Sequence, residues 1–176
     1  MCVCVCAYVL FFSSGTSAAS ADRKRCDLAT YDPALTVTLD LKNCGLTSVP
    51  SSIARFGALE KLDISLNPEL TDLPAALPPT LTTLFALGGG FVTIPPSVAR
   101  LPNLRMLSFK SCKLHDLGVA ALPSSLRWLI LTDNRLVTLP PSLGTLTQIR
   151  KLMLSNNREP LQPLQPSLPH ACLLLP

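Results

Sequence analysis

The chain has little of what marks a membrane protein or a nucleic-acid-binding protein. Only 15% of its 176 residues are charged and 5% are aromatic, with a single tryptophan. Although 48% are hydrophobic, no apolar run approaches the roughly 20 residues that a membrane-spanning helix needs. Lysine and arginine are scattered, apart from Arg23–Arg25. Because no basic stripe with stacking aromatics is present, the sequence predicts neither a nucleic-acid partner nor an integral membrane segment.

Residues that could carry catalysis are also scarce. The two histidines, His115 and His170, lie far apart, without a paired carboxylate or nucleophile in frame. Gly88–Gly90 is not continued into a phosphate-binding motif. Asp116–Gly118 mimics a kinase metal-binding motif, but no catalytic loop accompanies it. We therefore expect no catalytic site, no cofactor and no nucleotide turnover.

The seven cysteines do not form a recognisable metal site or disulfide framework. Cys2, Cys4 and Cys6 alternate along the chain, but they lack the second ligand pair and the histidine spacing of a zinc site. Cys44 and Cys112 fall at an equivalent position of a repeat, described below. They are interpreted as structural thiols, so the sequence predicts no metal and no disulfide.

The first 21 residues admit two interpretations. The stretch from Cys2 to Phe12 is apolar, and Ala19–Ala21 offers a cleavage site of the secretory type. However, no basic residue precedes the apolar stretch and Arg23–Arg25 follow it, which is the wrong charge order for translocation. Residues 1–21 are thus either a signal peptide of a secreted chain or a disordered leader. The charge order slightly favours the leader and a cytoplasmic location.

The remaining hydrophobic residues follow one template, L-x-x-L-x-L-x-x-N-x-L-x-x-L-P. Six copies begin at intervals of 22 or 23 residues, which identifies a repeat protein. Alternation of leucine within each copy predicts a short strand with one buried face. The strands are expected to stack in parallel. Their predicted bounds are Thr38–Lys42, Lys61–Ser65, Thr83–Leu87, Met106–Lys110, Trp128–Thr132 and Lys151–Ser155.

The ninth position of the template marks a turn after each strand. An inward asparagine amide or a small cysteine can occupy a buried turn beside unpaired backbone groups. Gly89 interrupts this ladder. The six residues at this position are Cys44, Asn67, Gly89, Cys112, Asn134 and Asn157.

Prolines after the last leucine of the template, such as Pro50, Pro95 and Pro140, predict the outer wall. Proline there disfavours a full helix and favours 3₁₀ or extended backbone. The predicted fold is therefore an α/β-type repeat solenoid, curved and right-handed, with a parallel concave sheet and an irregular or 3₁₀ convex side.

The template also divides the chain. Residues 22–35 are expected to form an N-terminal cap, residues 36–164 the six repeats, and residues 165–176 the start of a truncated seventh repeat. Glu159 and Pro160 displace the next expected leucine, and the chain then continues into an apolar tail without a polar cap. The sequence therefore predicts a fragment that self-associates through residues 161–176.

Two segments carry a resemblance to known proteins. Leu122–Leu136 and Lys151–Asn157 resemble the repeat region of leucine-rich-repeat protein kinases of bacterial, plant and algal type. The general repeat, from about Leu35 to Leu164, is also similar to that of Shoc2-like signalling scaffolds and plant resistance proteins. The resemblance implies the same solenoid fold. In those kinases a kinase domain follows the repeats, whereas no kinase motif occurs in this chain.

The expected function is to bind another protein through the concave face. Template positions 3, 5 and 7 point away from the core. On the C-terminal half of the face these positions form an apolar patch around Trp128, with lysines at its edge that would steer an acidic partner. The alternative is the non-catalytic ligand- or substrate-docking part of a leucine-rich-repeat kinase. The predicted partner-binding residues are Phe85, Leu87, Met106, Lys110, Trp128, Ile130, Lys151 and Met153.

Overall fold

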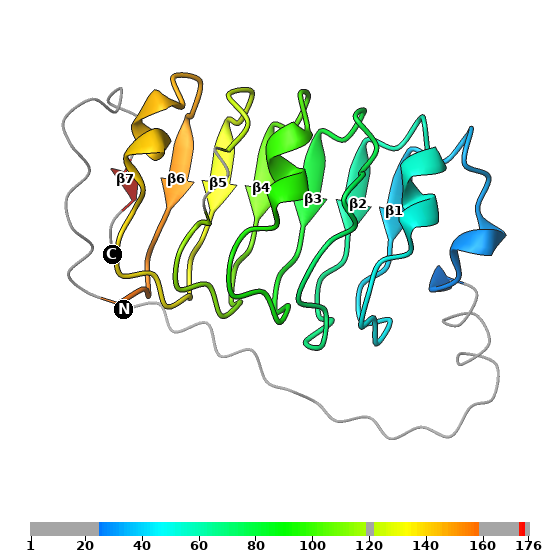
Figure 1. Cartoon of the computed structure of the whole chain (residues 1–176), viewed down its shortest axis with the longest axis horizontal. Coiled ribbons are helices and arrows are strands. Elements are labelled where there is room, and N and C mark those ends of the chain that lie inside the picture. Colours follow the sequence, from blue (N-terminus) through cyan, green and yellow to red (C-terminus); the bar gives the residue numbers. More distant parts are fainter. Residues whose placement is uncertain (1–24, 119–121, 159–172, 175–176) are drawn as a thin grey trace, which may run out of the picture.

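The computed structural model describes residues 25–118, 122–158 and 173–174. It is a solenoid in which one parallel sheet, ordered β1 to β7, forms a continuous wall (Figure 1). This is the predicted leucine-rich-repeat architecture. The strands are β1 (Thr38–Asp40), β2 (Lys61–Asp63), β3 (Thr83–Phe85), β4 (Met106–Ser108), β5 (Trp128–Ile130), β6 (Lys151–Met153) and β7 (Leu173–Leu174).

The centre of every strand from β1 to β6 is a buried leucine. Each pairs in register with the leucine of the next strand, as Leu62 does with Leu84, so the leucines form one row inside the coil. The expected burial of Leu62, Leu107 and Leu129 is confirmed, since all three are fully buried. This row and the residues packed against it form a single core that runs the length of the solenoid.

The strands begin where the sequence predicts but end two residues earlier, because the backbone turns sharply. The eighth template position adopts the left-handed conformation in all six repeats. Inter-repeat hydrogen bonds nevertheless continue past the strand ends, as from the Leu41 N–H to the Asp63 carbonyl at 2.7 Å. The left-handed residues are Asn43, Leu66, Gly88, Ser111, Asp133 and Asn156, with φ between 54° and 64°.

The asparagine ladder is present as predicted. The Asn67 amide oxygen accepts from the N–H groups of Cys44 and Leu46, both at 3.0 Å. Its amide nitrogen donates to the Leu41 carbonyl at 3.0 Å and to the Ile64 carbonyl at 2.8 Å. One side chain therefore satisfies backbone groups of two neighbouring repeats. Asn134 and Asn157 each form the equivalent bonds, to their own repeat and to the preceding one.

Where asparagine is missing, two other solutions fill the turn. Cys112 is a buried free thiol whose Sγ donates to the Ala86 carbonyl at 3.0 Å, as expected of a structural thiol. At Gly89, an added Cβ would lie 2.6 Å from the ring of Phe91. The Phe91 ring therefore takes the space of the missing side chain, and it packs edge-on against Phe109 with centroids 5.0 Å apart.

The interpretation of Cys44 as a free thiol is wrong. Cys44 forms a disulfide with Cys26, with Cα atoms 5.5 Å apart. The physical reason lies in its place at the end of the stack. Cys112 donates to a carbonyl of the preceding repeat, but Cys44 belongs to the first repeat and faces the segment that precedes it.

That preceding segment packs against the β1 end of the sheet. It includes the 3₁₀ turn η1 (Leu28–Thr30), and Leu28 and Tyr31 contact the core. Arg25 forms an ion pair with Asp40 at 3.2 Å. The expected leader, residues 1–21, lies outside the described residues, as do residues 159–172 of the expected C-terminal region. Beyond residue 172, the described strand β7 pairs in parallel with β6.

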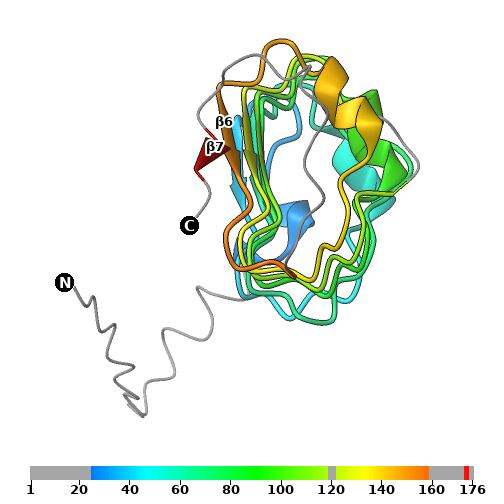
Figure 2. The same cartoon turned by 90° about the vertical axis from the view of Figure 1, so that its left-hand side faces the viewer.

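The wall opposite the sheet carries short 3₁₀ helices, as predicted (Figure 2). These are η2 (Ser51–Arg55), η3 (Pro96–Arg100) and η4 (Pro141–Thr145). Each belongs to a repeat that is 23 residues long. In the described parts of the 22-residue repeats no such helix forms, which accords with the prolines at Pro78 and Pro123. No described helix is long and apolar enough to cross a bilayer.

Candidate functional site on the concave face

Two adjoining hollows lie on the exposed face of the sheet. The first, at the N-terminal ends of the strands, has a volume of about 410 Å³. We call it the arginine hollow; it is lined by Glu60, Thr82, Thr83, Arg105, Met106, Arg127, Trp128 and Arg150. The second has a volume of about 390 Å³. We call it the apolar hollow; its lining includes Leu66, Phe85, Leu87, Ile130 and Met153, with Lys42 and Lys110 among its polar members.

The predicted partner-binding residues divide between these hollows. Met106 and Trp128 line the arginine hollow. Lys151 lines neither, but its Nζ lies 6.0 Å from the centre of the Trp128 ring. The predicted single apolar patch is thus two neighbouring surfaces. The other five predicted residues line the apolar hollow: Phe85, Leu87, Lys110, Ile130 and Met153.

Trp128 is the large aromatic side chain that stands out of this face. It is 44% exposed, although it belongs to a strand whose central leucine is fully buried. Lys151 approaches its ring from β6, within the range of a cation–π contact. The same arrangement recurs at the other end of the face, where the Lys61 Nζ lies 5.5 Å from the Phe85 ring. In both cases the ammonium group of a lysine on a neighbouring strand lies over the ring of an outward-facing aromatic side chain.

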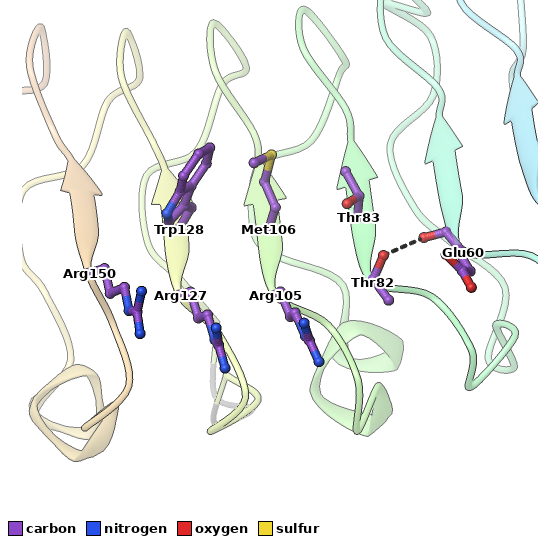
Figure 3. Close-up of a pocket in the computed structure, with 8 residues that line it drawn as sticks. All are labelled: Glu60, Thr82, Thr83, Arg105, Met106, Arg127, Trp128 and Arg150. Carbon is purple, nitrogen blue, oxygen red and sulfur yellow. Dashed lines mark hydrogen bonds between the residues drawn. The ribbon is translucent and has the colours of Figure 1, made fainter.

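A row of three arginines lies beside Trp128 and was not predicted from the sequence. Arg105, Arg127 and Arg150 occupy the second template position of three successive repeats, at the starts of β4, β5 and β6 (Figure 3). Strict strand alternation directed attention to positions 3, 5 and 7, whereas position 2 precedes the strand. Aligning this single column of the repeat would have revealed the row.

A backbone ladder sets the spacing of these arginines. In each repeat from the second to the sixth, the N–H groups at positions 2 and 3 both donate to the position-2 carbonyl of the preceding repeat. The N–H groups of Arg127 and Trp128, for example, donate to the Arg105 carbonyl, both at 2.9 Å. Adjacent strands are about 4.8 Å apart, so the row spans roughly 10 Å. Among the described residues, none of the three guanidinium groups has an ion-pair or hydrogen-bond partner.

The charge of the concave face changes along the solenoid. On repeats four to six, positions 2, 3, 5 and 7 carry five basic side chains and no acidic one. On repeats one to three, the same positions carry two basic and three acidic side chains, the acidic ones being Asp40, Glu60 and Asp63. The face thus has a positive half around Trp128 and a mixed half near β1 and β2.

Leu66 is unusual in both its conformation and its exposure. It adopts φ 58°, a region in which asparagine, aspartate and glycine are favoured and a leucine costs about 1–2 kcal/mol. Equivalent positions in other repeats hold Asn43 and Asn156. Its side chain is 45% exposed and lines the apolar hollow. A strained, exposed leucine at the edge of an apolar surface is typical of a binding site rather than of a stable turn.

The described residues offer little for catalysis. His115 does have a carboxylate partner, contrary to the sequence analysis, because its Nδ1 lies 2.8 Å from Oδ2 of the adjacent Asp116. Both side chains are about half exposed and lie outside the two hollows, which accords with the predicted surface histidine. Burial raises the pKa of the Cys112 thiol to about 11, which makes it inert near neutral pH. No described cluster of His, Cys, Asp and Glu could hold a metal ion.

Comparisons with known proteins agree with this fold. The family model described as Leucine Rich Repeat matches residues 125–146. The protein in the crystal structure of the TLR13–ssRNA13 complex is similar to 64% of this chain, with 30% sequence identity and a TM-score of 0.56. The chain corresponds to 17% of that protein's length. An internalin (inlF) from Listeria monocytogenes is 23% identical over 68% of the chain and 41% of its own length, with a TM-score of 0.46. No curated protein matches significantly.

Proposed function

We propose that the chain is a protein-binding module that recognises its partner through the concave face of the repeats. The observation that carries the proposal is the exposed Trp128, which lines the arginine hollow beside Arg105, Arg127 and Arg150, three side chains without an ion-pair or hydrogen-bond partner among the described residues. Tryptophan and arginine dominate the affinity of protein interfaces when they sit near the centre of a contact. Half-buried Phe85, Ile130 and Met153 add an apolar floor that a partner could cover.

A rigid scaffold strengthens this proposal. Every residue of the site lies on or next to a strand whose central leucine is buried, so the backbone beneath the site is held in register. A preformed surface costs less entropy on binding than a mobile one. The chain would therefore act as a docking surface, with no chemical step of its own.

Photo-crosslinking from the two sides of the molecule tests the proposal. A photoreactive phenylalanine analogue in place of Phe85 should capture a specific partner in cells. The same analogue in place of Val137, which is 48% exposed and lines neither hollow, should not. With the partner purified, Trp128→Ala should weaken binding by about 2 kcal/mol or more while the melting temperature stays nearly unchanged. Capture from Val137 alone would show that another surface binds.

Single-stranded nucleic acid is a second candidate ligand. Arginines beside an exposed aromatic ring are the usual elements of such sites, and the TLR13 structure contains ssRNA13. The resemblance to kinase repeat regions supports a further alternative, in which the same surface docks the substrate or ligand of a leucine-rich-repeat kinase. Isolation of the chain in one polypeptide with an active kinase domain would support that alternative.

A further inference from the structure

We infer that the partner segment is an acidic peptide with an apolar anchor, whose carboxylates contact the arginine row while its anchor fills the apolar hollow. This inference rests on the proposed function and adds the chemistry of the ligand. It joins three features of the described residues: the row Arg105, Arg127 and Arg150, the apolar hollow, and the strained Leu66 at its edge.

Charge complementarity selects an acidic ligand. Three guanidinium groups spanning roughly 10 Å, without an ion-pair partner among the described residues, repel one another until an anion lies between them. Guanidinium binds carboxylate through two parallel hydrogen bonds. Lys110 and Lys151 keep the neighbouring surface positive. No acidic side chain occupies positions 2, 3, 5 or 7 of repeats four to six to compete with the ligand.

The apolar hollow requires a second, uncharged group on the same ligand. Phe85, Leu87, Ile130 and Met153 are half-buried and remain partly open to solvent in the hollow. Leu66 extends this surface, and its side chain approaches Gly88, where an added Cβ would lie 3.2 Å from the leucine Cδ2. A leucine in a conformation that suits asparagine gives the turn no stability. Its presence is accounted for if a ligand side chain packs on it.

The distance between the two subsites specifies the spacing on the ligand. Arg127 immediately precedes β5, and Ile130, three residues further, is the last residue of that strand, which corresponds to about 10 Å along an extended chain. A peptide whose acidic part follows the row across β4 to β6, and whose chain then turns along β5, would therefore carry its last carboxylate about three residues from its apolar anchor.

These features favour a peptide over a nucleic acid. The basic row covers only β4 to β6, long enough for two or three phosphates, and Glu60, Asp63 and Asp40 would repel a strand that continued toward β1. The backbone and sugars of a nucleic acid also offer no aliphatic group for the apolar hollow. A short peptide with separate acidic and apolar ends satisfies both surfaces.

A set of labelled decapeptides tests the inference by fluorescence anisotropy. The reference probe has three consecutive glutamates, a two-residue spacer and a Leu-Phe anchor. In the first matched probe glutamine replaces the glutamates, and in the second serine replaces the anchor. We expect each change to weaken binding by about tenfold, and salt to weaken only the probes that retain the glutamates. A ten-nucleotide single-stranded RNA should not displace the reference probe.

Two variants and one control variant connect the probe to the two subsites. Arg127→Glu should weaken the reference probe by about tenfold or more. Arg100→Glu makes the same charge change at the end of η3, outside both hollows, and should change affinity less than about twofold. Leu66→Asn should weaken the reference probe by about threefold yet leave the serine probe unaffected. It should also raise the melting temperature, which separates lost contact from misfolding.

The outcomes separate this inference from the proposed function. Equal binding of the serine probe, equal effects of Arg127→Glu and Arg100→Glu, or tighter binding of the RNA would overturn the acidic-peptide inference. If a partner captured from Phe85 is weakened by Trp128→Ala but is not displaced by the reference probe, the protein-binding function stands and the inference fails. If capture occurs only from Val137, the concave face is the wrong surface and both fail.

Discussion

The buried and exposed faces of the sheet share one backbone but differ in how their side chains vary between repeats. The inward strand centre is leucine in every repeat from β1 to β6, and each of these leucines is at most 2% exposed. The next residue, which faces outward, is Asp40, Asp63, Phe85, Ser108, Ile130 and Met153 in the six repeats. Packing restricts the inward strand centre because its neighbours in the adjacent repeats are fixed. The outward residue that follows it is free to specify a ligand.

This contrast explains why the solenoid can carry a positive, apolar half and a mixed-charge half without changing shape. The pairing of β2 with β3 and of β5 with β6 keeps the same register, although the outward residues differ completely. Changes to inward groups should therefore alter stability, whereas changes to outward groups should alter binding.

Leu129→Ala should produce the largest loss. Leu129 is fully buried in the leucine row, and removing its side chain leaves a cavity that two neighbouring repeats cannot close. We expect a loss of about 2–5 kcal/mol in the free energy of unfolding, measured in urea. Ile130→Ala, one residue further on the exposed face, is the matched control and should cost clearly less. Similar losses for both variants would remove the distinction between the two faces.

Loss of the Cys26–Cys44 disulfide should come next. The bond closes a loop with a sequence separation of 18 residues, so breaking it increases the entropy of the unfolded chain. Replacing both cysteines by serine should cost about 3 kcal/mol. Reducing agent should destabilise the parent chain to the same extent and leave the double variant unchanged. A parent chain whose melting temperature ignores reducing agent would contradict the bond.

Asn134→Ala should cost about 1–3 kcal/mol, because it leaves buried backbone groups unpaired. Its amide serves the Leu114 N–H and the carbonyls of Phe109 and Leu131. Asn103→Ala is the control, since its exposed side chain makes one bond, to the Pro79 carbonyl. Thermal unfolding of both variants gives the comparison. The ladder would lose its assigned role if Asn103→Ala were the more damaging change.

The smallest effect concerns pH and Cys112. Burial raises the pKa of this thiol from its ordinary value of 9.0 to about 11, so above pH 9 the unfolded chain releases a proton that the folded chain retains. Stability is therefore fully present below pH 9 and decreases as the pH rises toward 11. Between pH 8 and 10 the loss should be about 1 kcal/mol. In Cys112→Ser this component should vanish, and an identical pH profile would refute the burial effect.

Much of the fold could be predicted from the chain because the repeat is regular. The spacing of leucines specified the starts of six strands, and Asn67, Asn134 and Asn157 marked the turns. The strand ends were misjudged because the left-handed eighth position has no common residue type; it holds asparagine, leucine, glycine, serine and aspartate. A pattern of side chains could not reveal a conformation that so many residue types adopt.

The candidate site could be predicted only in part, and the proposed binding role of its residues stays a prediction. Trp128 and the apolar residues followed from strand alternation. Arg105, Arg127 and Arg150 did not, because alternation breaks down where the chain enters the strand and positions 2 and 3 both face outward. Cys44 was misjudged because its position in the template suggested the role of Cys112, and the template carries no information about Cys26.

The disulfide at one end of the stack also gives the solenoid a mechanical direction. Each of the strands β1 to β6 pairs only with its immediate neighbours, so a load on the chain is passed from one repeat to the next. The covalent link between Cys26 and Cys44 holds the β1 end closed, while the described residues on the β6 side are joined by non-covalent contacts alone. Under tension the repeats should peel away one at a time from the β6 side. Each step would release about 75 Å of extended chain, and the first repeat would be the last to yield.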